Sequence, residues 1–234
     1  MTGRRPGKPS LPRPCLMLVT DRALAGGDDA LLTAVAAAVD GGVNAVQVRE
    51  KDLADDDLAI LVRRLRAVID DRAVIIVNDR LTVAKCAGAG GIHFGEPSET
   101  GRMVEVDGFE PLIVGRSVHS LAAAKEAVNS GADYLVLGTI FPSRSHPGGE
   151  SSGLERVRVV SSSVTIPVVA IGGITEDNLP GVIAAGAAGV AVISAILGRS
   201  DPSFAARTLR VALDGAWEGR PGNIAASPTT LGVA

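Results

Sequence analysis

Polar side chains end several apolar runs of this sequence, and their types and spacing are the first indication of chemistry. Gln47, Arg49 and Lys51 follow one another at intervals of two residues, so on an extended chain they project to one side. Asn78 and Asp79 end another apolar run, and a carboxylate there can hold Mg²⁺ through oxygen, with phosphate oxygens completing the shell. Two cations and one carboxylate-bound metal are what a diphosphate requires. The plainer alternatives are a strand end fraying into solvent and an Asn-Asp pair that caps the next helix.

A second group of loops is small and uncharged. Residues 172–175 read GGIT and residues 193–195 read ISA, each at the end of an apolar run. Such loops let backbone N–H groups approach an anion, and in β/α barrels the loops after the last two strands are the usual phosphate site. GGIT could also be a tight turn with Thr175 capping a helix. The residues thus predict one cationic site suited to a diphosphate and one site of backbone donors suited to a monophosphate.

Strands and helices must bring these loops to one end of the molecule. Eight short apolar runs, rich in β-branched residues, are separated mostly by stretches of helical spacing. The runs are CLMLVTD, AVQVRE, VIIVND, GIHFG, LIVGRS, YLVLGTIF, PVVAIGGI and GVAVISAI. Only the segment over 96–111 shows a weak helical pattern. Eight alternating units predict a single (β/α)₈ TIM barrel of α/β class, with its site at the C-terminal ends of the strands. An open doubly wound sheet is the alternative.

Glycines precede every second apolar run. The pieces DGGVNAVQVR, AGAGGIHFG, NSGADYLVLGT and AAGAAGVAVIS each run from a predicted helix end through glycine into a strand. Glycine just past a helix supplies a left-handed turn. A dinucleotide-binding glycine loop has the opposite order, strand before helix, so these glycines do not indicate one.

Composition bounds the class of protein. The chain is 46% hydrophobic but 3% aromatic, which predicts an aliphatic core typical of buried parallel sheets. A net charge of -3 indicates neither a nucleic-acid partner nor a membrane surface. No signal peptide is recognisable, so we expect a cytoplasmic protein, with Cys15 and Cys86 as small buried hydrophobes. We expect a disordered basic, proline-rich arm over 1–14, the catalytic barrel over 15–217 and a flexible tail over 218–234.

The motifs, taken in order, resemble thiamine phosphate synthases and their sister group, the thiazole tautomerases, over about residues 15–216. They are QVREK, VNDR, GIHFG, GRSVHS, ADYLVLGTIFPS, PVVAIGGIT and GVAVISAI. The resemblance implies a transferase that joins hydroxymethylpyrimidine diphosphate to hydroxyethylthiazole phosphate, yielding thiamine phosphate and diphosphate. It implies an ionisation mechanism, in which the bond from the pyrimidine methylene to oxygen breaks and the thiazole nitrogen captures the cation. Mg²⁺ is the implied cofactor, and the partners are these small phosphorylated substrates.

The resemblance also assigns roles to residues. The pyrimidine diphosphate would be bound by Gln47, Arg49, Lys51, Asn78 and Ser117, and Mg²⁺ by Asp79. The thiazole phosphate would be bound by Ser143, Ser145, Gly173, Ile193 and Ser194. Charge on the departing diphosphate would be stabilised by Arg49, Lys51, Ser117, Arg144 and His146.

Two positions depart from the family pattern. The family has a second magnesium aspartate where this chain has Ser98, so Glu96 or Glu99 could supply the oxygen, or Mg²⁺ could keep an extra water. The family has a lysine where this chain has His146. Because histidine is a conditional cation at neutral pH, stabilisation there would be weaker or would fall to Arg144.

These departures keep two other functions open. A tautomerase would move a proton on a carboxythiazole phosphate, with His119 as the acid and base. A non-catalytic barrel that binds thiamine precursors would be a regulatory protein. Retention of Gln47, Arg49, Lys51, Asn78 and Asp79 together favours the synthase, because a tautomerase has no diphosphate to neutralise. His93, in the middle of GIHFG, is interpreted as a hydrogen-bonded core histidine, and the oligomeric state is left open.

Overall fold

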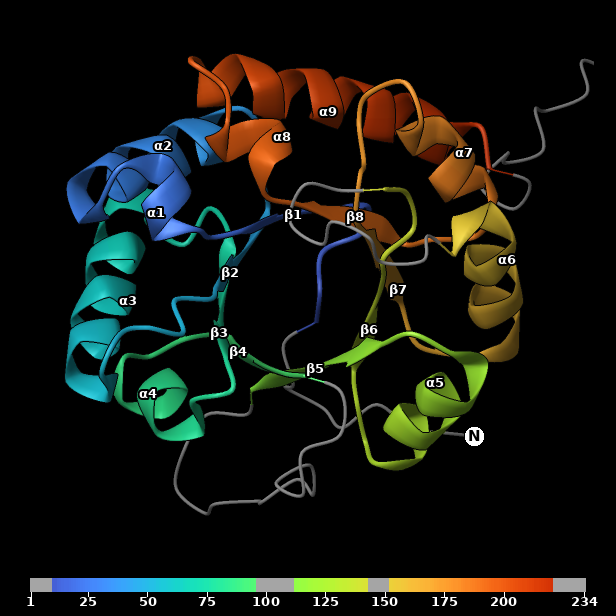
Figure 1. The fold of residues 1–234 in the computed structure, drawn as a ribbon, viewed down its shortest axis with the longest axis horizontal. Coiled ribbons are helices and arrows are strands. Elements are labelled where there is room, and N and C mark those ends of the chain that lie inside the picture. Colours follow the sequence, from blue (N-terminus) through green and yellow to red (C-terminus); the bar gives the residue numbers. More distant parts are fainter. Residues whose placement is uncertain (1–9, 96–111, 143–151, 221–234) are drawn as a thin grey trace, which may run out of the picture.

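Eight parallel strands form a closed barrel at the centre of the molecule (Figure 1). The computed structural model describes residues 10–95, 112–142 and 152–220. The strands are β1 Cys15–Val19, β2 Ala45–Val48, β3 Val74–Asn78, β4 Gly91–Phe94, β5 Ile113–Val118, β6 Tyr134–Leu137, β7 Val168–Ile171 and β8 Gly189–Val192. Each strand pairs with the next, and β8 pairs with β1. The predicted (β/α)₈ barrel is confirmed, and the open-sheet alternative is wrong.

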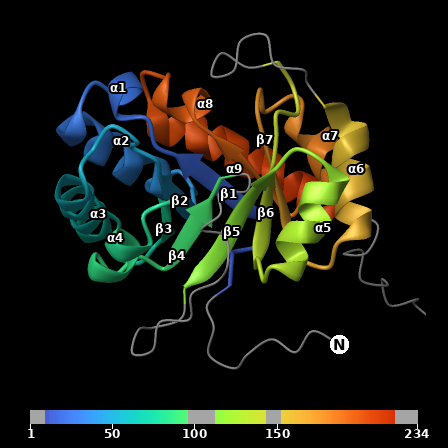
Figure 2. The same ribbon diagram turned by 60° about the horizontal axis from the view of Figure 1, so that its bottom comes forward.

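Helices surround the strands on the outside (Figures 1 and 2). They are α1 Arg22–Ala25, α2 Asp28–Asp40, α3 Asp55–Ile69, α4 Leu81–Cys86, α5 Leu121–Asn129, α6 Gly153–Ser163, α7 Leu179–Ala184, α8 Ser194–Leu197 and α9 Pro202–Glu218. The weakly patterned segment over 96–111 lies outside the described residues.

The strands are apolar throughout because both of their faces are buried. Outward residues such as Leu16 and Leu18 of β1 pack with the helices in one large aliphatic cluster. Inward residues of the same strand, Met17 and Val19, join a second cluster that fills the barrel. Leu11, five per cent exposed, belongs to this inner cluster, so residues ahead of β1 contribute to the barrel's filling.

Four of the glycines that precede strands have the predicted left-handed backbone. Gly42, Gly88, Gly131 and Gly186 have φ between 68° and 110°, a region that other residues rarely adopt. Each lies between a helix end and the next even-numbered strand. The alternation of helix, glycine and strand is therefore a property of the backbone as well as of the sequence.

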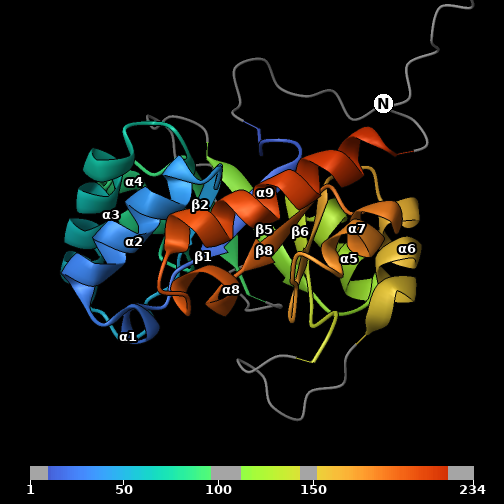
Figure 3. The ribbon, with the colours of Figure 1, turned by 90° about the horizontal axis from the view of Figure 1, so that it is seen from above.

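The carboxyl ends of the strands meet at one face, where the short helices α1 and α8 lie in contact (Figure 3). None of the helices within the described residues has the length and apolar character needed to cross a membrane. The two cysteines differ: Cys15 is buried, whereas Cys86 is exposed. The prediction of a buried Cys86 was wrong, because α4 is short and its last residue faces outward.

Candidate active site

A chain of side-chain hydrogen bonds joins β2 to the end of β3. Gln47 is buried and donates from Nε2 to Oδ1 of Asn78 at 3.0 Å. Asn78 in turn donates from Nδ2 to Oδ2 of Asp79 at 2.7 Å. The three residues predicted for pyrimidine and metal binding are thus brought together, and the amide of Asn78 fixes the carboxylate.

Asp79 has an unusual backbone at the point where the strand ends. Its φ is 60°, in the left-handed region, and its N–H donates to the carbonyl oxygen of His93 at 2.8 Å. Its Oδ1 accepts from the N–H of Gly95 at 3.2 Å. The carboxylate is thereby held between β3 and β4 and is exposed to solvent. Lone pairs remain on both oxygens, which suits Mg²⁺, an ion commonly bound by one or two carboxylates together with substrate phosphates.

The alternative of helix capping fails for this pair. Helix α4 begins at Leu81, its N-cap residue is Arg80, and no side chain caps it. Asn78 and Asp79 bond to β2, β4 and each other instead. Within the described residues no cluster of three acidic, histidine or cysteine side chains is present.

The cationic segment continues beyond β2. Arg49 is half-buried and Lys51 is exposed, and the charge of Arg49 contributes to a lowered pKa of the buried His93. Glu50, between them, is buried on the other side and accepts from the N–H of Arg22 at 3.1 Å through Oε2. Burial raises the pKa of Glu50. Glu50 therefore points away from the side on which Arg49 and Lys51 are predicted to lie, toward α1.

Ser117 is in contact with a buried histidine. Nε2 of His93 lies 2.9 Å from Oγ of Ser117, and Nδ1 lies 3.1 Å from the hydroxyl oxygen of Tyr134. Burial, followed by the charges of Arg116 and Arg49, lowers the pKa of His93 to about 3. The interpretation of His93 as a hydrogen-bonded core histidine is confirmed, and its bond to Ser117 adds a link to the site.

His119 lies one residue beyond β5 and is exposed. Its carbonyl oxygen accepts from Arg156 of α6 at 2.9 Å. The structure therefore places His119, the predicted acid and base of a tautomerase, at the carboxyl-terminal face.

The glycine loop after β7 is closed by an asparagine. Gly172 and Gly173 have φ of 104° and 62°. Asn178 accepts from the N–H of Thr175 at 2.9 Å and donates to the carbonyl of Gly173 at 2.9 Å. Thr175 does not cap a helix, because α7 begins four residues later, at Leu179. The capping alternative is therefore wrong, and the loop is a turn closed by Asn178. Strand β8 ends at Val192, just before Ile193 and Ser194.

The loop after β6 leaves the barrel against these glycines. The N–H of Phe141 donates to the carbonyl of Gly172 at 3.0 Å. A Cβ atom on Gly173 would lie 2.5 Å from the carbonyl oxygen of Pro142, so a larger residue there is sterically excluded. The N–H and hydroxyl of Ser152 both donate to the carbonyl of Thr139 at 2.9 Å. Both stems of this loop are thus tied to one place beside the glycine turn.

Several predicted site residues lie outside the described residues. They are Ser143, Arg144, Ser145 and His146 after β6, and Glu96, Ser98 and Glu99 after β4.

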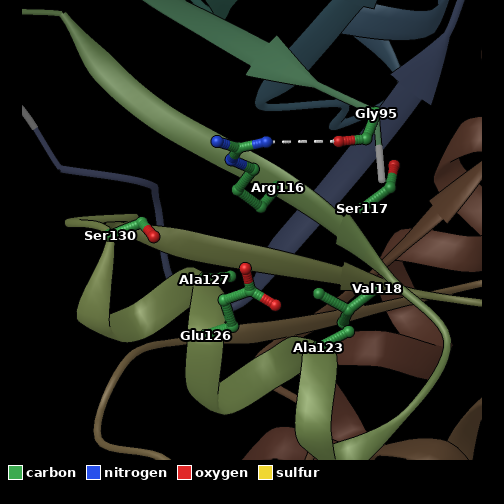
Figure 4. A pocket seen from close by; sticks show the side chains of 8 residues that line it. All are labelled: Gly95, Arg116, Ser117, Val118, Ala123, Glu126, Ala127 and Ser130. Atoms are coloured by element: carbon green, nitrogen blue, oxygen red, sulfur yellow. Dashed lines mark hydrogen bonds between the residues drawn. The ribbon is translucent and has the colours of Figure 1, made fainter. Parts of the chain in front are cut away.

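A small cavity of about 40 Å³ lies between β5 and α5 (Figure 4). Ser117, Arg116 and Glu126 are among its lining residues, and Arg116 reaches the carbonyl of Gly95. This volume is far below the several hundred Å³ typical of ligand pockets. The strand ends, rather than this cavity, are therefore the candidate active site.

Comparison with known proteins agrees with this geometry. The family described as thiamine monophosphate synthase matches residues 16–196. The chain belongs to this family. It is 43% identical over 199 residues to a putative thiamine-phosphate synthase of Geobacter sulfurreducens, covering 83% of this chain and 92% of that protein. It is 42% identical over 200 residues to the thiamine-phosphate synthase of Methanoculleus marisnigri, covering 83% and 93%.

A solved structure in the same family has the same fold. Thiamine phosphate pyrophosphorylase from Pyrococcus furiosus superposes with a TM-score of 0.75 at 36% identity, covering 86% of this chain and 96% of that one. The predicted resemblance to the thiamine monophosphate synthase family is confirmed.

Three residues near the family's motifs were missed by sequence reasoning. Thr20 accepts from the N–H of Arg49 at 3.0 Å, Glu50 packs beneath α1, and Tyr134 contacts His93. Thr20 and Tyr134 belong to apolar runs of the sequence. A hydroxyl-bearing residue in such a run indicates a buried polar group that needs a hydrogen-bond partner. Their partners depend on strand register, which the sequence does not contain.

Proposed function

We propose that the chain is a thiamine-phosphate synthase, condensing hydroxymethylpyrimidine diphosphate with hydroxyethylthiazole phosphate to give thiamine phosphate and diphosphate. The observation that carries the proposal is the bonded set Gln47–Asn78–Asp79 next to Arg49 at the carboxyl ends of β2 and β3. A tautomerase releases no diphosphate and needs no such set. The named synthases among its relatives support the same reaction.

The proposed chemistry begins with ionisation. The bond from the pyrimidine methylene carbon to the diphosphate oxygen breaks, and its electron pair leaves with diphosphate. The thiazole nitrogen then donates its lone pair to the methylene carbon, forming the carbon–nitrogen bond. Negative charge grows on the departing oxygen, and fixed donors and cations aimed there stabilise the transition state. Arg49 and Lys51 fill this role, with Ser117 as a further donor.

Asp79 would hold Mg²⁺, assisted by the amide of Asn78, which keeps the carboxylate in place. The ion supplies additional positive charge to the phosphate oxygens when bound. The second protein oxygen would come from the segment after β4, at Glu96, Ser98 or Glu99.

The thiazole phosphate is assigned to the other side of the barrel. Gly173, Ile193 and Ser194 lie after β7 and β8, the place where β/α barrels commonly bind phosphate. Ser143 and Ser145 follow the loop stem that rests on Gly172 and Gly173, which supports their assignment to the same phosphate. In this proposal the two anionic groups bind at different strand ends of the same barrel face, one near β2 and β3 and the other near β7 and β8.

A steady-state assay with both phosphorylated substrates and Mg²⁺ tests the proposal. We expect diphosphate release matched one to one by thiamine phosphate, and at least 100-fold loss with Asp79→Ala, the scale seen on removing one group that stabilises a transition-state anion. Proton exchange on carboxythiazole phosphate without diphosphate release would replace the synthase with the tautomerase. Tight binding of the precursors with neither activity would identify a binding protein.

A further inference from the structure

Three neighbouring strands place a tyrosine, a glycine and a histidine at one level inside the barrel. Gly115 of β5 is opposite His93 of β4 on one side and Tyr134 of β6 on the other. A Cβ atom on Gly115 would lie 2.1 Å from Cζ and 2.4 Å from the hydroxyl oxygen of Tyr134. The tyrosine ring therefore occupies the space that a side chain at position 115 would fill, and in this way it crosses over β5. Its hydroxyl reaches Nδ1 of His93 at 3.1 Å.

The surroundings determine which group donates. Tyr134 is fully buried, and burial raises its pKa well above the ordinary value, so the phenol keeps its proton. A buried hydroxyl proton without an acceptor costs free energy, and within the described residues Nδ1 of His93 is the partner that the Tyr134 hydroxyl meets. Nδ1 must then accept. In a neutral imidazole the other nitrogen carries the proton, so Nε2–H points at Oγ of Ser117, 2.9 Å away.

We propose that Tyr134 and His93 form a one-way hydrogen-bond chain that ends at Ser117 and makes the serine hydroxyl a donor toward the barrel mouth. His93 is a positioning residue, locked as the Nε2–H tautomer by the tyrosine. The inference rests on the proposed function, in which Ser117 meets the substrate diphosphate.

The direction of the chain matters because phosphate oxygens only accept. If Ser117 donated to His93, it would turn lone pairs toward the anion and repel it. With His93 donating, the serine oxygen accepts from behind and its own proton is free for the diphosphate. A charged imidazole is not required, which agrees with the burial of the ring and the positive charges of Arg116 and Arg49 near it.

Tautomer state can be measured without substrate. Nitrogen-15 NMR of the full-length protein, labelled at histidine, should show His93 as a neutral Nε2–H imidazole, assigned by its absence from His93→Gln. Tyr134→Phe should change the tautomer ratio of this ring, because Nδ1 loses its donor. A neutral Nδ1–H imidazole in the unmodified protein would overturn the proposal.

Activity then tests the link to Ser117. We expect His93→Leu and Ser117→Ala each to lower kcat about 100- to 1,000-fold, the scale for one donor to a developing anion, and the double variant to be no worse than Ser117→Ala. His93→Gln, which keeps an N–H facing Ser117, should recover part of the loss. Additive losses in kcat would show a general structural role and contradict the chain.

Pyrophosphate binding separates the two proposals. Calorimetry with inorganic pyrophosphate and Mg²⁺ should show binding to the unmodified protein and at least tenfold weaker binding to Ser117→Ala and Tyr134→Phe. If the unmodified protein neither binds pyrophosphate nor turns over, the synthase proposal fails even where NMR shows the Nε2–H tautomer. If the unmodified protein binds pyrophosphate and turns over while the variants also bind pyrophosphate normally, the synthase proposal is supported and the hydrogen-bond chain to Ser117 is wrong.

Discussion

The side-chain oxygen of Thr20 accepts a hydrogen bond from the backbone N–H of Arg49 at 3.0 Å. The N–H of Thr20 donates to the carbonyl of Gln47 at 2.9 Å, and the Thr20 side chain lowers the pKa of the buried Glu50 carboxyl, against the larger raising effect of burial. One threonine after β1 therefore fixes the chain at the point where β2 becomes the cationic segment. The position of Arg49 depends on a residue that carries no charge.

Replacing Thr20 by valine keeps the shape of the side chain and removes its hydroxyl. We expect the free energy of unfolding to fall by about 1–3 kcal/mol, because the backbone N–H of Arg49 loses its hydrogen-bond acceptor. KM for the pyrimidine diphosphate should rise about tenfold, equivalent to about 1.4 kcal/mol of binding. Thr20→Ser keeps the hydroxyl and is the control, measured by urea unfolding and steady-state kinetics. Equal KM values for the two variants would show that the hydroxyl does not position Arg49.

Substituting Gly115 by alanine should disturb the interior without adding a polar group. The new methyl would overlap the ring of Tyr134, and overpacking of a tight core costs about 1–3 kcal/mol. We also expect loss of the His93 tautomer preference and lower kcat. Gly215→Ala in α9 is the matched control, since a Cβ there meets nothing within 4 Å and should stabilise the helix by roughly 1 kcal/mol. Unchanged kcat in Gly115→Ala would mean that the tyrosine can shift without consequence.

Removing the side chain of Asn78 should weaken metal binding. Asn78→Ala leaves Asp79 without the 2.7 Å bond that orients it, and loss of such outer contacts typically costs 10- to 100-fold in metal affinity. The Mg²⁺ concentration for half-maximal turnover should rise by about tenfold or more. EDTA should abolish turnover of the unmodified protein, and excess Mg²⁺ should restore it.

The control uses the same substitution at the opposite end of the barrel. Asn44 accepts from the N–H of Leu16 and donates to the carbonyl of Pro14, each at 2.9 Å. Asn44→Ala should lower stability and leave the Mg²⁺ dependence unchanged. Similar Mg²⁺ curves for the two variants would contradict the assignment of Asn78 and Asp79.

The two cysteines should differ in reactivity. Burial raises the pKa of Cys15 from 9.0 to about 12, whereas Cys86 is exposed. A thiol reagent at pH 8 should label one cysteine in the folded protein and both in urea. Rapid labelling of Cys15 under native conditions would show that the barrel opens there.

The same pKa gives a pH dependence with a definite sign. The folded pKa of Cys15 lies above the unfolded value, so its contribution to stability is intact below pH 9 and is lost as pH rises toward 12. Between these values the free energy of unfolding should fall by about 1.4 kcal/mol per pH unit. The difference between the unmodified protein and Cys15→Ala, followed by urea unfolding from pH 8 to 10.5, isolates this slope. No change in that difference would contradict a buried thiol.

The fold was readable because its elements are locally encoded. The runs around Met17 and Gln47 are apolar on both faces, and Gly42 and Gly131 mark where helices end. The ends of β2 and β3 were also correctly predicted as meeting, since parallel strands of one barrel end at one face. Bonding between Gln47 and Asn78 follows from that adjacency.

Other contacts depend on register and helix length, which local patterns do not contain. Ser117 and His93 are 24 positions apart, and their bond requires the register of β4 and β5. Thr175 has the type of a capping residue, but Asn178 closes its turn because the loop continues to Leu179. Cys86 was expected to be buried, yet α4 ends there with that side chain outward.

Leu11, a member of the inner cluster, has a consequence for how substrates enter the enzyme and products leave it. The space inside the strands is packed by side chains such as Leu11, Met17 and Tyr134, as is usual for such barrels, so the described residues leave no channel between the two ends of the barrel. Both substrates must therefore enter, and both products leave, at the carboxyl-terminal end of the barrel. The released diphosphate must therefore leave before the next substrate can bind, so that product release is a step of every turnover.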